Sequence, residues 1–128
     1  MDRHAVSTVA APGGGDSYSQ AVVVGNLVFV AGTVGKDMAT GTWPAGIQAQ
    51  MEQALKNLSA ILAEAGCTLD DVVKTTTFIT PEAVGGGGEE VYVRAFSDPK
   101  PARSCPVVAL PVRQALVSIE AIAVKPDA

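Results

Sequence analysis

The sequence predicts a single α+β domain in which the secondary-structure elements follow the order β-β-α-β-α-β-β. Segments rich in β-branched residues occur near both ends of the chain and in its middle, and one long apolar stripe with helical spacing lies between them. The chain has 128 residues, of which 48% are hydrophobic, so it is about one domain long and can bury a core. We therefore expect one mixed β-sheet with two helices packed on one face.

The first 15 residues are expected to form a flexible N-terminal arm, followed by one domain over residues 16–126. The arm ends in Ala-Ala-Pro-Gly-Gly-Gly, a cluster of residues that interrupts helices and strands.

An antiparallel hairpin is predicted next, with strands over Tyr18–Val24 and Leu27–Gly32. Gly25 and Asn26 lie between them, and these residue types suit a two-residue turn because such turns need positive φ angles. The segment Thr33–Pro44 mixes Gly, Asp, Thr and Pro, which predicts a loop.

The segment Ala45–Ala65 is predicted to be an α-helix, because its apolar residues form one stripe with a 3.6-residue period. The stripe consists of Ile47, Met51, Ala54, Leu55, Leu58, Ile61 and Leu62. Gly66 follows where a left-handed glycine can end the helix. A connecting turn over residues 69–72 then leads to Val73–Thr80, whose β-branched residues predict a strand.

The second helix is predicted to be short. Gly85–Gly88 would cost roughly 1 kcal/mol per glycine relative to alanine, so we expect helix only over Glu89–Phe96, with loose packing. The last two strands are predicted over Ser104–Leu110 and Leu116–Val124. Pro106 removes a backbone donor from the first of these strands, which implies a sheet edge or a bulge.

The net charge and the cysteines limit the possible functions. A net charge of −4 and a pI near 4.8 argue against nucleic acid or an anionic membrane as partner. No apolar stretch approaches the roughly 20 residues of a membrane span, and the N-terminus lacks the apolar core of a secretory signal, so we expect a cytoplasmic protein. Cys67 and Cys105 form no C-x-x-C motif and are expected to be thiols, whose redox role stays open.

The single histidine excludes several kinds of catalytic site. His4 lies in the predicted arm, so Ser-His-Asp, Cys-His and multi-histidine metal sites would lack an imidazole. Acid and base chemistry would then depend on carboxylates, a lysine, a tyrosine or bound water. We accordingly predict no metal site.

Arg103 is the best candidate for binding a ligand. Its planar guanidinium has five donors that match a carboxylate, and a strand is predicted to begin directly after it. An arginine before a strand is also often a surface or interface ion pair, and spacing alone leaves both possibilities open. Glu120 lies in an apolar strand, where a charged residue needs solvent or a partner. Its same-face neighbours Ser118 and Ile122 suit a half-polar cleft wall.

Two further residues have both a structural and a functional interpretation. Tyr18 can be an ordinary strand aromatic or the wall of a cleft, and the residues alone favour neither. Cys105 has no imidazole or base near it in the sequence, so we expect its side chain to be a small buried hydrophobe.

Several blocks of the sequence match a known family pattern in register from about Tyr18 to Val124. These blocks are Tyr18–Ala21, Val24–Gly32, Val72–Thr76, Val91–Tyr92, Pro101–Cys105, Leu110–Pro111 and Ile119–Ala123. Together they resemble the YjgF/RidA family of reactive-intermediate imine/enamine deaminases. The blocks occur in order along nearly the whole chain, and together they identify the family far more specifically than any single block would.

The resemblance implies a chorismate-mutase-like α+β fold, a homotrimer and ligand clefts at the three subunit interfaces. It also implies a reaction without a cofactor, the hydrolysis of 2-imino or enamino acids to 2-keto acids and ammonia. In this chain, Arg103 would hold the substrate carboxylate and Glu120 would orient the attacking water. Tyr18 would wall the cleft, and the backbones of Gly32 and Cys105 would meet polar atoms of the substrate.

Two cleft positions depart from the family pattern. Ala31 stands where the deaminases usually carry serine, and Glu89 stands where they carry asparagine. A carboxylate at Glu89 would repel the substrate carboxylate unless it is protonated, turned away or paired. Two functions therefore stay open: an imine deaminase with an altered substrate range, or a non-catalytic trimeric binder or sensor of small 2-keto or carboxylic acids.

Overall fold

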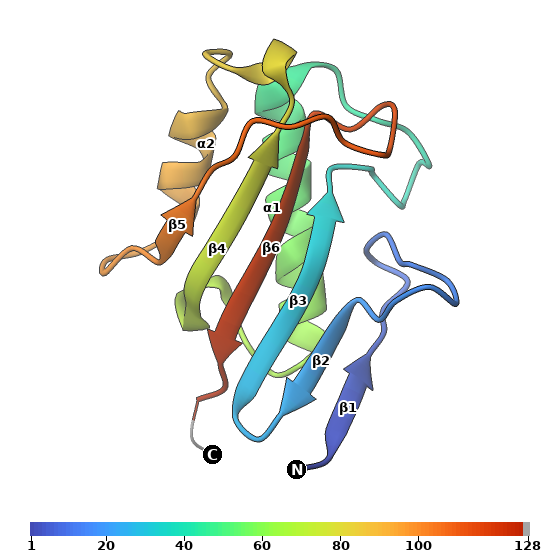
Figure 1. Ribbon diagram of the computed structural model, residues 1–128, viewed down its shortest axis with the longest axis vertical. Coiled ribbons are helices and arrows are strands. Elements are labelled where there is room, and N and C mark those ends of the chain that lie inside the picture. Colours follow the sequence, from blue (N-terminus) through green and yellow to red (C-terminus); the bar gives the residue numbers. More distant parts are fainter. Residues whose placement is uncertain (127–128) are drawn as a thin grey trace.

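The computed structural model describes residues 1–126, which form one six-stranded sheet and two α-helices (Figure 1). The elements are β1 (Arg3–Val6), β2 (Ala21–Val24), β3 (Leu27–Val34), α1 (Gly46–Glu64), β4 (Val72–Ile79), α2 (Gly88–Ala95), β5 (Ala102–Ser104) and β6 (Val117–Val124). The strand order is β1-β2-β3-β6-β4-β5, and the pairs are antiparallel except for β4 with β5. The predicted α+β class and mixed sheet are confirmed, with one strand more than the predicted order contains.

The additional strand lies within the segment that we expected to be a loose arm. Arg3–Val6 pairs antiparallel with β2 as an edge strand. After it, the side-chain amide of Gln20 bonds to the backbone of Thr8, Ala11 and Pro12 over 2.7 to 3.0 Å. Residues 3–6 therefore form a strand where none was predicted. Three of the four β1 side chains are exposed, so hydrophobic periodicity did not reveal the strand.

The predicted hairpin is confirmed as β2 and β3, although its first strand begins later than expected, at Ala21. Gly25 has a φ of 60°, and no residue other than glycine has a positive φ within residues 1–126. Asn26 therefore has a negative φ, and positive φ at the first turn position alone is the pattern of a type II′ turn.

Helix α1 matches its prediction, and it ends as the sequence indicates. Gly66 has a φ of 82°, its N–H donates to the carbonyl of Ala63 at 3.0 Å, and the N–H of Cys67 donates to Leu62 at 2.8 Å. This pair of bonds is a Schellman motif, which satisfies carbonyls that the helix end leaves open.

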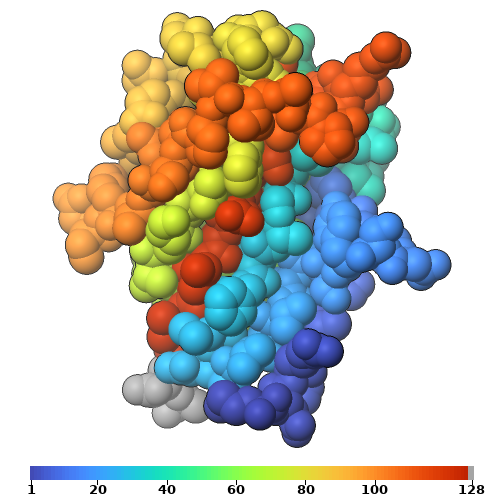
Figure 2. Space-filling model, in the orientation of Figure 1, coloured from blue at the N-terminus to red at the C-terminus, as the bar shows by residue number. Residues whose placement is uncertain are grey.

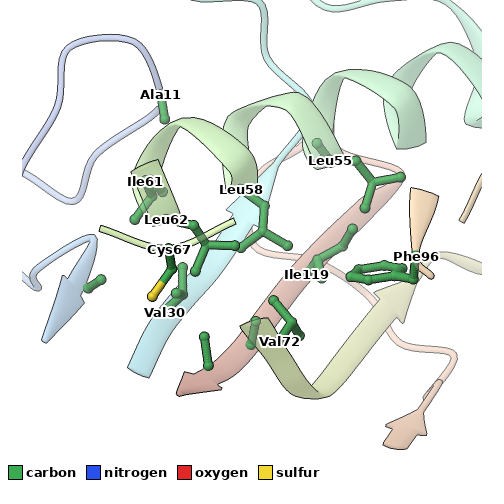
Figure 3. Close-up of a cluster of buried hydrophobic side chains, with 14 of the residues drawn as sticks. Ala11, Val30, Leu55, Leu58, Ile61, Leu62, Cys67, Val72, Phe96 and Ile119 are labelled. Atoms are coloured by element: carbon green, nitrogen blue, oxygen red, sulfur yellow. The ribbon is translucent and has the colours of Figure 1, made fainter. Parts of the chain in front are cut away.

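The core lies between α1 and the sheet. All seven residues of the predicted apolar stripe are buried. In Figure 3, Leu58 and Leu62 point from α1 toward the sheet, where Val30 and Ile119 are also buried. Burying a side chain the size of leucine contributes about 2 kcal/mol, so this layer fixes the position of the helix on the strands.

Helix α2 lies beside α1, and both helices cover the same face of the sheet, as predicted (Figure 1). The expectation that α2 packs loosely because of its glycines is wrong. A Cβ at Gly86 or Gly88 would lie 2.5 or 2.8 Å from side-chain atoms of Ile47. These glycines therefore allow the start of α2 to approach α1 closely.

The segment after β5 is less regular than predicted. The strand ends at Ser104, and only an isolated bridge between Val107 and Ile79 continues the pairing. Pro106 has no N–H to donate, although its carbonyl accepts a bond from Ile79 at 3.1 Å. The predicted sheet edge is confirmed, because β5 is the last strand of the sheet.

The second face of the sheet carries no helix. Figure 2 looks onto this face, where atoms of β3, β4 and β6 reach the surface. Leu27 and Phe29 of β3 are exposed there by 37% and 42%.

None of the helices in residues 1–126 is both long enough and apolar enough to cross a lipid bilayer.

Candidate ligand-binding site

Arg103 lies on the edge strand β5 and forms a bidentate ion pair with Glu89 from the first turn of α2. Its Nη1 and Nη2 donate to Oε1 and Oε2 of Glu89 at 2.9 and 3.1 Å. These bonds raise the pKa of Arg103 above its ordinary value, so the guanidinium stays charged. The pair holds the fork in the orientation in which two parallel N–H groups meet one carboxylate.

The guanidinium of Arg103 rests on an aromatic ring. Its central carbon lies 4.5 Å from the ring centre of Tyr92, which fits a cation–π interaction. The hydroxyl of Tyr92 shares a 2.6 Å hydrogen bond with Oγ1 of Thr75, and both side chains are buried. Burial raises the pKa of Tyr92, so the ring below Arg103 is a neutral phenol. Tyr92 thus joins α2 to β4 and supports the cation.

A cavity of about 230 Å³ opens beside this ion pair. Its apolar wall includes Ile47 and Met51 of α1, and Cys105 also lines it. Thr77 contributes a buried Oγ1 that has no hydrogen-bond partner within residues 1–126. A buried hydroxyl normally has a partner, so this unsatisfied oxygen in the cavity wall is unusual.

Glu120 lies elsewhere, on the sheet face that no helix covers. The register of β3 with β6 passes from Val30 paired with Ala121 to Thr33 paired with Ile119. Two residues of β3 therefore oppose the single residue Glu120, which is the arrangement of a β-bulge.

The two residues at this bulge are Ala31 and Gly32, so the fold brings both of them to Glu120. A Cβ at position 32 would lie 2.7 Å from Oγ of Ser118, which explains why glycine fits here. A shallow hollow of about 190 Å³ lies at this place, lined in part by Glu120 and Lys74.

The predicted site residues therefore do not meet within one chain. Arg103 pairs in register with Thr75, and Glu120 pairs with Thr76. Successive residues of a strand point to opposite faces, so Arg103 faces the helices and Glu120 faces away from them. Tyr18 forms a third location, because it is 55% exposed and lies in the loop before β2.

The cysteines differ from the prediction. Cys105 is exposed in the single chain, so the expectation that its side chain is a buried hydrophobe is wrong. Cys67 is buried instead, and burial, with a smaller contribution from Asp71, raises the pKa of its thiol. Both are free thiols. Across residues 1–126, no group of three or more His, Cys, Asp or Glu side chains is arranged to hold a metal ion.

Sequence reasoning missed Tyr92 and Thr77 as parts of the site. Tyr92 follows Glu89 by three positions, so both lie on one face of α2, and this spacing was the available signal. For Thr77, alternation along β4 predicts an inward side chain, but no sequence pattern indicates that its hydroxyl lacks a partner.

Comparison with known proteins identifies the family. Residues 8–125 match the family described as Endoribonuclease L-PSP. The chain belongs to the RidA/YjgF/L-PSP family. It is 41% identical over 124 residues to a mouse protein named 2-iminobutanoate/2-iminopropanoate deaminase, with 96% of this chain and 92% of that protein covered. The predicted resemblance is therefore confirmed.

Solved structures of RidA-family proteins agree with the fold. RidA from an Antarctic Psychrobacter has a TM-score of 0.86 and 39% identity, covering 94% of this chain and 98% of its own. TdcF from E. coli, whose structure is described with bound serine, has a TM-score of 0.86 and 34% identity, with 96% and 99% covered.

In this RidA-family chain, the structure decides among the three arrangements considered for Glu89. The carboxylate is paired, and its partner is Arg103 itself. The side chains are 58% exposed for Glu89 and 26% exposed for Arg103, so the pair lies at the mouth of the cavity.

Proposed function

We propose that this RidA-family protein hydrolyses reactive 2-imino and enamino acids to 2-keto acids and ammonia. The observation that carries the proposal is the oriented guanidinium fork of Arg103 beside a cavity with an unpartnered buried hydroxyl, that of Thr77. The names of the mammalian relatives agree with this chemistry, since they are called 2-iminobutanoate/2-iminopropanoate deaminases. The bound serine of TdcF agrees with a ligand that carries a carboxylate next to an amine-bearing carbon.

In the proposed reaction, Arg103 holds the substrate carboxylate through two parallel hydrogen bonds. Glu120 accepts a proton from water while the water oxygen bonds to the carbon of the protonated imine and the π electrons pass to nitrogen, which forms a neutral carbinolamine. Glu120 then returns this proton to the amino nitrogen, and the carbon–nitrogen bond breaks with its electron pair leaving on ammonia. The carbinol hydroxyl gives its own proton to Glu120, and from there to solvent, as it becomes the ketone of the product. No electron acceptor or cofactor enters this balance.

The proposal requires a second copy of the chain, because Arg103 and Glu120 lie on opposite faces of one sheet. In a homotrimer, the Glu120 face of one subunit would complete the Arg103 cavity of its neighbour. The cavity of one chain is also smaller than the roughly 300–1,000 Å³ of typical ligand pockets. Leu27 and Phe29 are exposed on the open face, and burial of these apolar side chains would favour association with another subunit. Light scattering at micromolar concentration should give a trimer, and a monodisperse monomer would contradict this assembly.

The experiment that tests the roles compares Arg103→Lys with Glu120→Gln. Lysine cannot reproduce the two parallel donors, so Arg103→Lys should weaken 2-keto acid binding and lower imine turnover together. Glutamine keeps the shape of Glu120 but is not a base, so binding should survive while turnover falls by about 10²-fold or more. Calorimetry measures the affinity, and the absorbance decay of imines generated by an amino-acid oxidase measures turnover.

Two exposed residues outside the proposed site provide matched controls, Arg113→Lys and Glu64→Gln. Both variants should behave as the unmodified protein in the two assays. Near-normal affinity and turnover in Arg103→Lys would show that the carboxylate-anchor role is wrong.

A binder or sensor of small 2-keto or carboxylic acids is the second candidate function. The Glu89–Arg103 pair favours it, because an internal carboxylate already occupies the donors that a substrate would use. Ala31 also removes the hydroxyl that the family usually places beside the neighbouring glycine. Binding of 2-keto acids without faster decay of any imine tested would support this candidate over the enzyme.

A further inference from the structure

The carboxylate of Glu89 occupies the hydrogen-bond donors of Arg103 in the way that a substrate carboxylate would. Both of its oxygens accept from the two terminal nitrogens of the guanidinium, at 2.9 and 3.1 Å. A ligand carboxylate can reach the same two donors only if Glu89 moves. The Glu89 side chain is 58% exposed and has space to move. Gly87, directly before α2, has a φ of 93°, and Glu89 lies in the first turn of the helix, where it lines the cavity.

The charged groups around the cavity disfavour a simple anion. Among the described residues that line it, Arg103 carries a positive charge, and Glu89 and Glu90 carry negative charges. The formal sum is −1, so a 2-keto acid anion raises the net negative charge of the site. A zwitterion brings no net charge, and like charges placed together at a binding site reduce affinity.

Displacement also leaves the Glu89 carboxylate without its cation. An ammonium or protonated imine on the carbon next to the ligand carboxylate would lie close enough to replace that cation. The unpartnered hydroxyl of Thr77 in the cavity wall does not distinguish the two ligands, because a hydroxyl can accept from an N–H group or donate to a ketone oxygen. A ketone oxygen has no proton to donate, so it cannot satisfy the displaced Glu89 carboxylate.

We propose that Glu89 determines specificity by exchanging its bond with Arg103 for a bond with the cationic nitrogen of the ligand. The cavity thereby prefers zwitterionic 2-amino and protonated 2-imino acids to 2-keto acid anions. The inference rests on the proposed role of Arg103 as carboxylate anchor. In the proposed reaction, this preference means that Glu89 favours binding of the zwitterionic imino acid substrate and release of the anionic keto acid product.

The test uses alanine and pyruvate, which differ at carbon 2 and are both stable to hydrolysis of this kind. Calorimetry gives the affinities of both for the unmodified protein and for Glu89→Gln. Glutamine frees Arg103 from competition and loses the charge that binds the ammonium. Pyruvate affinity should rise by about fivefold, the upper range for an exposed ion pair, and the alanine-to-pyruvate affinity ratio should fall by about tenfold.

Two further variants separate the alternatives. Glu90→Gln changes the charge of the cavity by the same amount without removing the Arg103 partner, so it should change the ratio less than Glu89→Gln does. Glu89→Asn, which is shorter, should shift the ratio in the same direction as Glu89→Gln. Circular dichroism confirms that each variant is folded.

The inference and the proposed function fail in different ways. An affinity ratio that changes by less than twofold in folded Glu89→Gln and Glu89→Asn overturns the specificity role, whatever the turnover. Equal weakening of both ligands also overturns it, because this would indicate a purely structural role. A shifted ratio in a protein that accelerates no imine decay supports the specificity role and refutes the deaminase.

Discussion

Tyr92 connects α2 to the sheet below Arg103, and its removal should have a measurable cost. Its hydroxyl and Oγ1 of Thr75 are 2.6 Å apart, and the two residues are only 4% and 0% exposed. Neither hydroxyl can reach water if the other is removed. Tyr92→Phe leaves the Thr75 hydroxyl buried without a partner, which should lower the free energy of unfolding by about 1–3 kcal/mol. Thr75→Val keeps the β-branched shape and should cost a similar amount, because the Tyr92 hydroxyl is then unsatisfied.

The double variant Tyr92→Phe/Thr75→Val is compared with the two single variants. It removes both hydroxyls and leaves no unsatisfied group, so its cost should be smaller than the sum of the two single costs. From the penalty for one buried unpaired hydroxyl, we expect a coupling free energy of about 1–2 kcal/mol. A coupling free energy of this size would show that the two hydroxyls stabilise the fold through their mutual hydrogen bond, which links α2 to β4.

Urea unfolding at a fixed protomer concentration is the appropriate assay, because association adds to apparent stability. Thr76→Val is the matched control, since Thr76 is the next residue of β4 and points to the opposite face. It should change the unfolding free energy by less than about 0.5 kcal/mol. Additive single costs, or a Tyr92→Phe cost below that value, would refute this account.

Two other predictions concern close packing and pH. A Cβ at Gly35 would overlap the backbone carbonyl of Gln50, so Gly35→Ala should lower the free energy of unfolding by about 1–3 kcal/mol. A Cβ at Gly13 would have its nearest neighbour, an atom of the Gln20 side chain, at 3.5 Å, so the control Gly13→Ala should change this free energy little. Thermal unfolding measures both variants. The raised pKa of buried Cys67 stabilises the fold at pH values below the unfolded thiol pKa of 9.0, and this stability is lost as pH rises through the folded pKa. The stability advantage over Cys67→Ala should therefore shrink between pH 8 and pH 10, and an unchanged advantage in urea unfolding would contradict the assignment.

The fold was predictable where local pattern and tertiary structure agree. The helical spacing of the apolar residues in α1 predicts which side of the helix is buried. Gly66 marks the end of the helix, because it adopts a backbone conformation that glycine favours. Strand β1 could not be found in this way, because it is held by backbone pairing with β2 and most of its side chains are exposed. The strand predicted over Ser104–Leu110 was too long, because one proline outweighed the β-branched residues around it.

The sequence proposed candidate site residues, but it did not indicate that they lie on opposite faces of the sheet. The resemblance suggested Arg103 and Glu120 as site residues, but their register partners are adjacent residues of β4, so the two side chains point to opposite faces. One residue of register decides this outcome, and strand ends cannot be predicted to one residue from sequence. The contact of Glu89 with Arg103 also depends on how α2 packs against β5, which no local pattern contains.

The exposure of the Glu89–Arg103 pair decides whether a ligand can use the same cation. A buried pair that loses one partner costs about 3–5 kcal/mol, so a buried Glu89 would hold Arg103 closed. With side chains exposed by 58% and 26%, this pair contributes about 0–1 kcal/mol, and water can solvate Glu89 when it leaves. The Tyr92 ring centre lies 4.5 Å from the guanidinium carbon, a second contact of the cation that does not involve Glu89. In the proposed site, the ring holds the fork for a ligand carboxylate, and Glu89 affects which carboxylate occupies it.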